Sequence, residues 1–385
     1  MITRRSVKLA ILNNVERLRK WNCYKFYSRQ FKRYCDMHGI TSSLVEGEEE
    51  YVRKWSVFTP RVERWSYRLF SRYMGPDADI IPEDIGHTWL EDTLNPRRYR
   101  DYYSDKNTFD DLFREGTMPV TVLRRVGGSS LMDACWHTVS DLGNADLHSV
   151  FSRLVLKPSV DSCSGVGVML FERIGNDYVA LKENVKLTTD FLLSYGDDFI
   201  LQEAIEQHPD LARFNPTSVN TLRLLTYRSV KDERVRVVAG ILRIGRSGEV
   251  CDNAHMGGRI VAINLRTGNL GNYVCDQYGN RSDTWNGTDF STGNYTVPNW
   301  EKALEFAGYV SGKIRHHRLI QLDVTIDKQG VPRLIEFNVG GCGFWLYMFC
   351  GQKCLGNYTD EIIEYCLKRN KGKTGQCNNG IISII

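Results

Sequence analysis

The segment 319–341, LIQLDVTIDKQGVPRLIEFNVGG, constrains the fold most strongly because it predicts two strands joined by a tight turn. Both runs are rich in β-branched and apolar residues, and the DKQG between them has turn chemistry. A two-residue loop made by Gln329 and Gly330 would pair Lys328 with Val331. We therefore expect a β-hairpin whose register is set by this loop.

This register places two acids directly across from each other, Asp323 on the first strand and Glu336 on the second. Strand alternation puts Asn338 on the same face as Glu336. Opposed like charges are destabilising, so a cation is expected between them, and carboxylate and amide oxygens are ligands that Mg²⁺ accepts. The pattern fits a site for a magnesium–nucleotide complex, and it also fits an ordinary hairpin with a polar solvent face.

A chain of 385 residues, 42% hydrophobic and 25% charged, indicates a globular protein of two or three domains. No apolar run reaches the roughly 18–20 residues that a membrane-spanning helix needs, and no signal peptide is recognised. Eleven cysteines without regular spacing predict reduced thiols and a cytoplasmic location.

Positive charge is concentrated at the start of the chain, where residues 1–35 contain ten Lys and Arg and one acid, Glu16. Such a segment can contact the anionic inner face of a membrane peripherally, or a phosphorylated substrate. A solvated helix face explains the same charges.

Hydrophobic periodicity predicts helices over 4–38 and 47–74, a loop-rich segment over 76–104, and a strand-rich block over 119–340. Within and after this block, helices are expected over 131–142, 298–315 and 358–368. Strands are expected over 119–126, 153–158, 166–172, 199–205, 221–227, 235–243, 259–264 and 269–274. Many strands with few covering helices predict an α+β fold with a mainly antiparallel sheet core and a helical N-terminal extension.

Two lysines are candidates for phosphate binding. Lys157 ends the strand RLVLKP and precedes a loop of small residues, and Lys106 lies upstream in DKNTFDDLF. An ammonium beside backbone N–H groups can hold phosphate, although a lysine at a strand end more often extends into solvent. Downstream, Glu203, Ala204 and Ile205 end a buried strand and can offer backbone groups to adenine and a carboxylate to ribose.

The order of these pieces resembles the ATP-grasp superfamily over roughly residues 104–341. The thirteen-residue gap from Asp323 to Glu336 and the E-x-N motif are the most specific matches. The resemblance implies bound ATP and Mg²⁺. The residues it implies are Lys106, Lys157, Ser164, Gly165, Gly167, Glu203, Ala204, Ile205 and Asp210 for ATP, and Asp323, Glu336 and Asn338 for Mg²⁺.

The segments IEQHPDLARFNPTSVNTLRLLTY and DNAHMGGRI, together with the helical N-terminal extension, look more specifically like the sugar-transfer-associated ATP-grasp group, which is related to α-L-glutamate ligases. This resemblance implies a ligase that joins a carboxylate to an amine or hydroxyl through an acyl phosphate in bacterial surface polysaccharide assembly. The expected partners are small molecules, including sugars or lipid-linked sugars, and not nucleic acid. The substrate-binding candidates are Asn220, Asp252, Asn253, Gly257 and Gly258, although Asp252 and Asn253 also suit a simple turn.

One position departs from the pattern of D-alanine-ligase-like enzymes, because Gln321 stands where they usually carry an arginine two residues before the metal-binding acid. Arg223 and Arg259 are therefore the candidate catalytic cations, and structural ion pairs are the alternative for both. An enzyme that only phosphorylates, or a non-catalytic nucleotide-binding protein, also fits these motifs.

We expect four parts along the chain. They are a helical extension over 1–104, an ATP-grasp subdomain with the two lysines over 105–200, a second subdomain with hinge and metal residues over 201–369, and a tail over 370–385.

Overall fold

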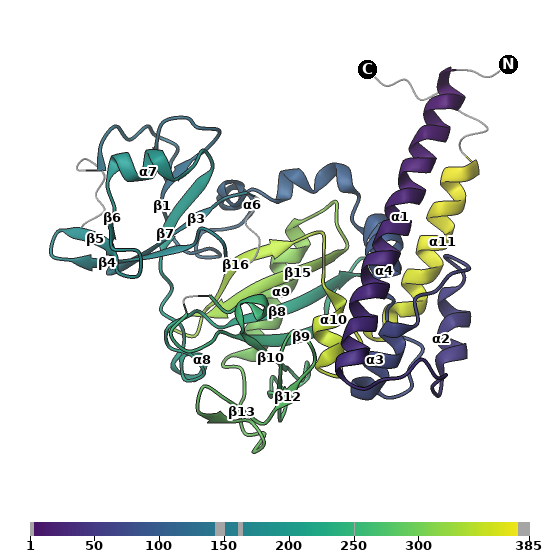
Figure 1. The fold of residues 1–385 in the computed structure, drawn as a ribbon. Coiled ribbons are helices and arrows are strands. Elements are labelled where there is room, and N and C mark those ends of the chain that lie inside the picture. Colours follow the sequence, from purple (N-terminus) through teal and green to yellow (C-terminus); the bar gives the residue numbers. More distant parts are fainter. Residues whose placement is uncertain (1–3, 143–150, 161–164, 250, 376–385) are drawn as a thin grey trace.

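The computed structural model describes residues 4–142, 151–160, 165–249 and 251–375. Within these ranges the chain forms two seven-stranded sheets, a separate two-stranded hairpin and a group of helices at one end (Figure 1). Neighbouring strands in both large sheets run antiparallel. The α+β class and the antiparallel core are confirmed.

The first sheet carries one of the candidate lysines and buries a small apolar core. Leu154, Leu156, Phe171 and Leu201 form this core together with Leu192 of the helix α7 (Thr189–Tyr195). In spatial order its strands are β2 (Met132–Asp133), β1 (Thr121–Arg125), β7 (Phe199–Glu203), β3 (Arg153–Pro158), β4 (Met169–Ile174), β5 (Asp177–Ala180) and β6 (Val185–Lys186).

The second sheet contains the acidic hairpin and is covered on both faces. In spatial order its strands are β12 (Arg281–Ser282), β11 (Val274–Cys275), β10 (Arg259–Ala262), β9 (Val235–Ile244), β8 (Thr221–Arg228), β15 (Leu319–Ile326) and β16 (Pro332–Asn338). Leu322 packs toward α9 (Trp300–Lys313), whereas Leu319 packs toward the N-terminal helices. Every residue of β15 is consequently buried.

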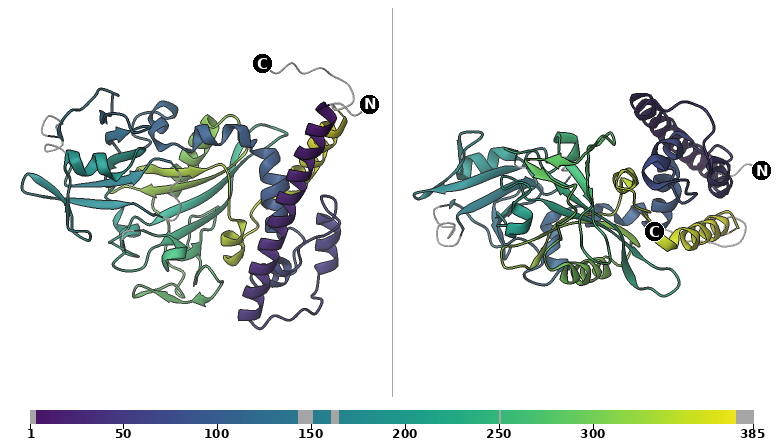
Figure 2. Two further views of the ribbon diagram at one scale, coloured as in Figure 1. Left: turned by 45° about the horizontal axis from the view of Figure 1, so that its top comes forward. Right: turned by 90° about the horizontal axis from the view of Figure 1, so that it is seen from below.

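The helical group joins segments from the two ends of the chain. Phe31 of α1 (Arg4–Met37), Phe70 of α3 (Trp65–Met74) and Phe349 of α10 (Phe344–Phe349) share one core. The other members are α2 (Glu48–Trp55) and α11 (Thr359–Gly375). In Figures 1 and 2, α1 lies at the edge of the molecule, and α1 and α11 extend toward the same end. Among the described residues, no helix combines the length and apolar character needed to cross a membrane.

Short elements complete the chain. They are α4 (Glu83–Ile85), the π-helical turn η1 (Gly86–Glu91), α5 (Asp92–Leu94), η2 (Arg97–Tyr99), η3 (Asp101–Tyr103), η4 (Lys106–Thr108), α6 (Phe109–Leu112), α8 (Pro209–Ala212), η6 (Ala254–Met256), β13 (Thr284–Trp285), β14 (Thr288–Asp289) and η7 (Gly356–Tyr358). The expectation of loops over 76–104 is wrong for residues 83–94, which are continuously helical.

The helix expected over 131–142 is absent, since these residues form β2 and turns. Asp133 explains the difference. Its carboxylate accepts hydrogen bonds from the backbone N–H groups of Cys135 at 2.8 Å and His137 at 2.9 Å. An aspartate that bonds to backbone groups just after it favours a turn over a helix, despite the apolar spacing.

The turn of the acidic hairpin also differs from the expectation. Asp327, rather than Lys328, pairs with Val331, so the loop spans three residues, and Gly330 takes a positive φ of 79°. A β-bulge at Ile335 then adds one residue to β16, which returns Asp323 to its place opposite Glu336. The predicted acid pair is correct, although the predicted loop is wrong.

Asn95 fastens the helical extension to the acidic hairpin. Its side-chain oxygen accepts from the backbone N–H groups of Arg318 and Leu319, both at 3.0 Å. Its amide nitrogen donates to the carbonyls of Leu319 and Val339, the latter at 3.0 Å. One buried side chain thus holds the start of β15 and the segment after β16.

We expect Asn95→Ala to lower the free energy of unfolding by about 2–3 kcal/mol, because it leaves several buried backbone groups without partners. Denaturant titration followed by circular dichroism measures this change. The exposed Asn22→Ala is the matched control and should change stability by less than about 0.5 kcal/mol. Equal stability of the two variants would contradict the role of Asn95.

Candidate active site

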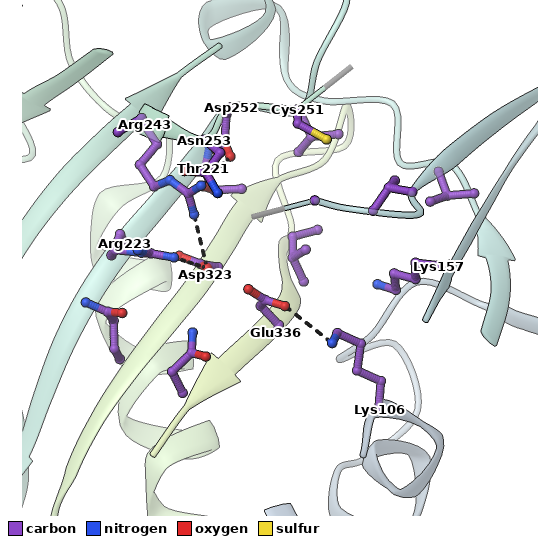
Figure 3. Close-up of a pocket in the computed structure, with 18 of the residues that line it drawn as sticks. Lys106, Lys157, Thr221, Arg223, Arg243, Cys251, Asp252, Asn253, Asp323 and Glu336 are labelled. Atoms are coloured by element: carbon purple, nitrogen blue, oxygen red, sulfur yellow. Dashed lines mark hydrogen bonds and ion pairs between the residues drawn. The ribbon is translucent and has the colours of Figure 1, made fainter. Parts of the chain in front are cut away.

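A cavity of about 440 Å³ lies between the two sheets, a size typical of small-molecule sites. Figure 3 shows that its lysines come from the side of the first sheet and its acids and arginines from the second sheet. Lys106, Lys157, Arg223, Asp323 and Glu336 all line it. Residues expected from separate motifs thus meet in one cavity.

The bulge in β16 gives the cavity its acidic wall. Leu334 and Phe337 enter the apolar core, whereas Ile335, Glu336 and Asn338 face the cavity. Without the extra residue, Glu336 would share the face of Leu334 and would enter the core. Bulges commonly redirect side chains beside active sites in this way.

Asp323 is held by two arginines, one from the adjacent strand β8 and one from β9 beyond it. The Arg223 guanidinium donates to both carboxylate oxygens at 2.8 and 2.7 Å, and Arg243 donates to one of them at 3.3 Å. Burial would raise the pKa of Asp323, but these two cations outweigh it and lower the pKa to about 2. Asp323 is therefore ionised at neutral pH.

Arg243 extends this network to a second acid. It forms an ion pair with Asp252 at 3.0 Å, and Asp252 also accepts hydrogen bonds from the backbone N–H of Thr221, at 3.0 Å, and from the Thr221 hydroxyl. Sequence reasoning missed Arg243 and Thr221. An arginine within the apolar run VVAGILRI was the available signal, because a buried arginine requires an acidic partner.

The two lysines lie together at the opposite wall. The ammonium of Lys106 lies 3.5 Å from Glu336, and its backbone N–H donates to the carbonyl of Ser159 at 3.0 Å, close to Lys157. Burial, together with the positive charge of Lys106, lowers the pKa of Lys157 to about 8, although Glu336 opposes this change. Two adjacent buried ammonium groups form a site suited to an anion.

The donor set fits Mg²⁺ chemically. Asp323 and Glu336 oppose each other in the sheet, and Asn338 adds an amide oxygen on the cavity face. Among the described residues, no three His, Cys, Asp or Glu side chains form a metal cluster. An ion held here would therefore take further ligands from phosphate and water, as Mg²⁺ commonly does.

The expected adenine segment enters the cavity only in part. Glu203 and Ile205 line the cavity, but Ala204 does not. The backbone N–H groups of Glu203 and Ala204 already donate to the carbonyls of Val120 at 2.9 Å and Arg153 at 3.1 Å. The Glu203 carboxylate likewise accepts from the Val120 N–H at 3.0 Å. The N–H groups of Glu203 and Ala204 therefore already have backbone partners, and the expected contact of this segment with adenine stays a prediction.

Arg259, expected as a catalytic cation, lies outside the cavity. Its guanidinium packs over the ring of Trp285 at 4.4 Å and donates to the carbonyls of Gly257 and Gly258 at 3.3 and 3.4 Å. Gly258 in turn packs closely against the backbone of Asp252, since a Cβ there would lie 2.6 Å from that carbonyl oxygen. Arg259, Gly257 and Gly258 therefore shape the loop that positions Asp252, and they do not face the cavity.

Other expected residues are divided between the cavity and its surroundings. Asp252, Asn253 and Gly165 line the cavity. Asn220 is buried and donates to the carbonyls of Leu211 and Asn215, so it has a structural role. Two further residues do not line the cavity: Asp210 is exposed on α8, and Gly167 packs against Pro158. The expectation for Ser164 falls on a position outside the described residues.

Gln321, at the position where an arginine was expected, is fixed at the cavity wall. Its amide nitrogen donates to the Tyr347 hydroxyl at 3.0 Å and to the carbonyl of Cys342. The positive charge beside Asp323 is supplied by Arg223 and Arg243 from two other strands. The expectation that Arg223 lies at the site agrees with this position.

Glu91 of the helical extension supports the loop that follows β16. Its carboxylate accepts from the backbone N–H of Gly341 at 2.6 Å and is held by His87 at 2.7 Å and Arg100 at 3.5 Å. Glu91 does not itself line the cavity, but it fixes the loop that follows the E-x-N motif, whose Gly341 does. Sequence reasoning missed this contact because it assigned the segment around Glu91 to loops.

The family described as sugar-transfer associated ATP-grasp matches residues 87–364. Because this range covers well over half of the sequence, the chain belongs to that family and has the ATP-grasp fold. A search among curated protein sequences found no match.

Three solved structures illustrate the more distant similarity. A D-cycloserine synthetase is 14% identical, with a TM-score of 0.38, and the match covers 72% of this chain and 73% of that one. An L-amino acid ligase from Bacillus licheniformis is 13% identical, with a TM-score of 0.38 and coverages of 70% and 50%. A D-alanine–D-alanine ligase from Bacillus anthracis is 12% identical, with a TM-score of 0.37 and coverages of 70% and 69%. The match thus spans half the length of the L-amino acid ligase.

We expect the affinity for ATP to fall as pH rises above about 8, because Lys157 would hold phosphate in its protonated form and its pKa in the free protein is about 8. Bound phosphate would raise the pKa of Lys157. Binding of ATP would therefore take up a proton at pH values between the pKa of Lys157 in the free protein and its pKa in the complex. Phosphate monoesters titrate near pH 6 and do not contribute in this range.

Isothermal titration calorimetry in buffers of different ionisation enthalpy measures this proton uptake. The control is Lys157→Gln, which should bind ATP more weakly and lose the proton uptake near pH 8. Unchanged proton uptake in this variant would assign the effect to another group.

Proposed function

We propose that this protein is an ATP-dependent ligase that joins a carboxylate to an amine, or less readily to a hydroxyl, through an acyl phosphate. The observation that carries the proposal is the meeting, in one cavity, of two buried lysines with Asp323, Glu336 and the arginines of β8 and β9. Membership of the ATP-grasp family supports the same chemistry.

Lys106 and Lys157 would hold the phosphates of ATP, and Glu203 and Ile205 would border the adenosine. Asp323, Glu336 and Asn338 would hold Mg²⁺, which neutralises charge on the transferred phosphate. The loop that contains Gly165 would lie beside the phosphates. Each residue mainly positions the reactants or balances charge, which is the principal task of a phosphoryl-transfer site.

In the first step, an oxygen of the substrate carboxylate attacks the γ-phosphorus, and the bond to the β-phosphate oxygen breaks, releasing ADP. In the second step, the amine attacks the acyl carbon, inorganic phosphate leaves, and the amine loses a proton. Arg223 and Arg243 would stabilise negative charge on the acyl phosphate and on the tetrahedral intermediate. Asp252 and Asn253, which lie beside Arg243, would position the acceptor.

The family description points to sugar chemistry, so we propose a sugar acid or an amino acid as the carboxylate and bacterial surface polysaccharide assembly as the setting. The test is an ADP-release assay with Mg²⁺ and panels of sugar acids, amino acids and amines, followed by mass analysis. A product whose mass is that of the acid plus the amine minus one water supports ligation, whereas a stable phosphorylated acid would contradict it.

We expect Lys157→Ala and Glu336→Ala to lower ADP release by at least about 10²-fold, because each removes a charge that balances the transferred phosphate. The matched controls are Lys302→Ala and Asp210→Ala, which remove the same charges at exposed positions and should retain nearly full activity. Thermal unfolding shows whether each variant is folded. Full activity in a folded Lys157 or Glu336 variant would refute the site assignment.

A further inference from the structure

The long helix α1 has two different faces. One face enters the core of the helical group through Phe31, Tyr34 and Cys35, which are buried. The opposite face, called here the outer face, carries exposed residues spaced three or four apart along the helix. They are Ile11, Val15, Leu18, Asn22, Phe26, Arg29 and Arg33.

The first half of the outer face is apolar. Ile11, Val15, Leu18 and Phe26 are 58%, 58%, 60% and 59% exposed, and the adjacent Leu12 is 54% exposed. An exposed helix face ordinarily carries polar residues. At 1.5 Å per residue, the stretch from residue 11 to residue 26 is about 22 Å long. Asn22 is the one polar residue of the outer face within it, so the apolar residues form a stripe rather than a scattered set.

The second half of the outer face is basic. Arg29, Arg33 and the adjacent Lys25 are exposed, and among the described residues no carboxylate lies within ion-pair distance of any of them. The nearest acid along this face, Asp36, is paired with Lys32 at 2.8 Å. Their charge is therefore available to an anionic partner.

We propose that the outer face of α1 binds an anionic lipid surface, with the helix lying flat in the headgroup layer. An apolar stripe beside basic residues is the arrangement by which an amphipathic helix binds such a surface. Both views in Figure 2 show α1 at the edge of the molecule away from the two sheets, where a planar surface can approach it.

The charges favour a lipid surface over a second copy of the chain. Contact between two outer faces would bury Arg29 and Arg33 without supplying carboxylates, which is costly unless each charge is paired. A layer of anionic headgroups supplies partners along the whole helix. The proposal does not depend on the ligase function, because it rests on residues remote from the cavity.

Co-sedimentation of the full-length protein with vesicles tests the proposal. We expect binding to vesicles of phosphatidylcholine mixed with phosphatidylglycerol, and little binding to phosphatidylcholine alone. Each basic residue near an anionic surface contributes a factor of about five, so Arg29→Gln combined with Arg33→Gln should weaken binding about thirty-fold. Leu18→Asn combined with Phe26→Asn should weaken it at least about tenfold.

The matched control is Arg17→Gln, which removes an exposed positive charge from another face of the same helix and should weaken binding by less than about threefold. Circular dichroism confirms that each variant is folded. Absence of binding to anionic vesicles, or equal losses in the control and the double variant, would overturn the proposal. A dimer in light scattering that Leu18→Asn disrupts, without a change in vesicle binding, would assign the outer face to a second copy instead.

Discussion

The ion network around Asp323 is the interaction on which the site depends. Asp323 lies on a strand with every residue buried, and a lone carboxylate there would be very costly. Arg223 and Arg243, from the two strands beyond it, make the charge tolerable and fix its orientation. Buried ion pairs add little net stability compared with apolar packing. We infer that this network is present for the chemistry of the cavity rather than for the stability of the sheet.

Two side chains of the helical extension make it part of the working fold rather than an appendage. Asn95 binds the backbone at both ends of the acidic hairpin, and Glu91 binds the loop that follows it. The extension therefore holds the hairpin that carries Asp323 from outside the sheet. The family match begins at residue 87, within this connection.

Much of the fold could be predicted from local patterns. The strand β3 has the predicted bounds, and β15 begins where the predicted hairpin begins, because β-branched and apolar runs end at clear turn residues. The failures share one cause, which is that a side chain or a tertiary contact competed with the apolar spacing. Asp133 turned a helical pattern into a turn. The contact of Glu91 with Gly341 accompanies helix formation over 83–94, where a loop-rich segment was expected.

Site residues could be proposed from the sequence where their types and spacing form a motif within one segment. Lys106, Lys157, Asp323, Glu336 and Asn338 could be proposed because short motifs carry them, and the tertiary fold brings these motifs to one cavity. Arg243 was missed, and Arg259 was expected at the site although it lies outside the cavity. Strand order decides which arginine faces an acid, and strand order is set by long-range pairing.

The sequence by itself determined that two carboxylates would oppose each other in a hairpin, with an amide on the same face, and that two lysines would precede them. Only the tertiary structure decided which way these groups point. The loop has three residues rather than two, and the bulge at Ile335 restores the register and turns Glu336 from the core to the cavity. A strand alternates faces at every residue, so one inserted residue reverses the outcome. The burial of Leu334 and Phe337 beneath α9 makes this insertion favourable, and a sequence pattern read one segment at a time does not contain that contact.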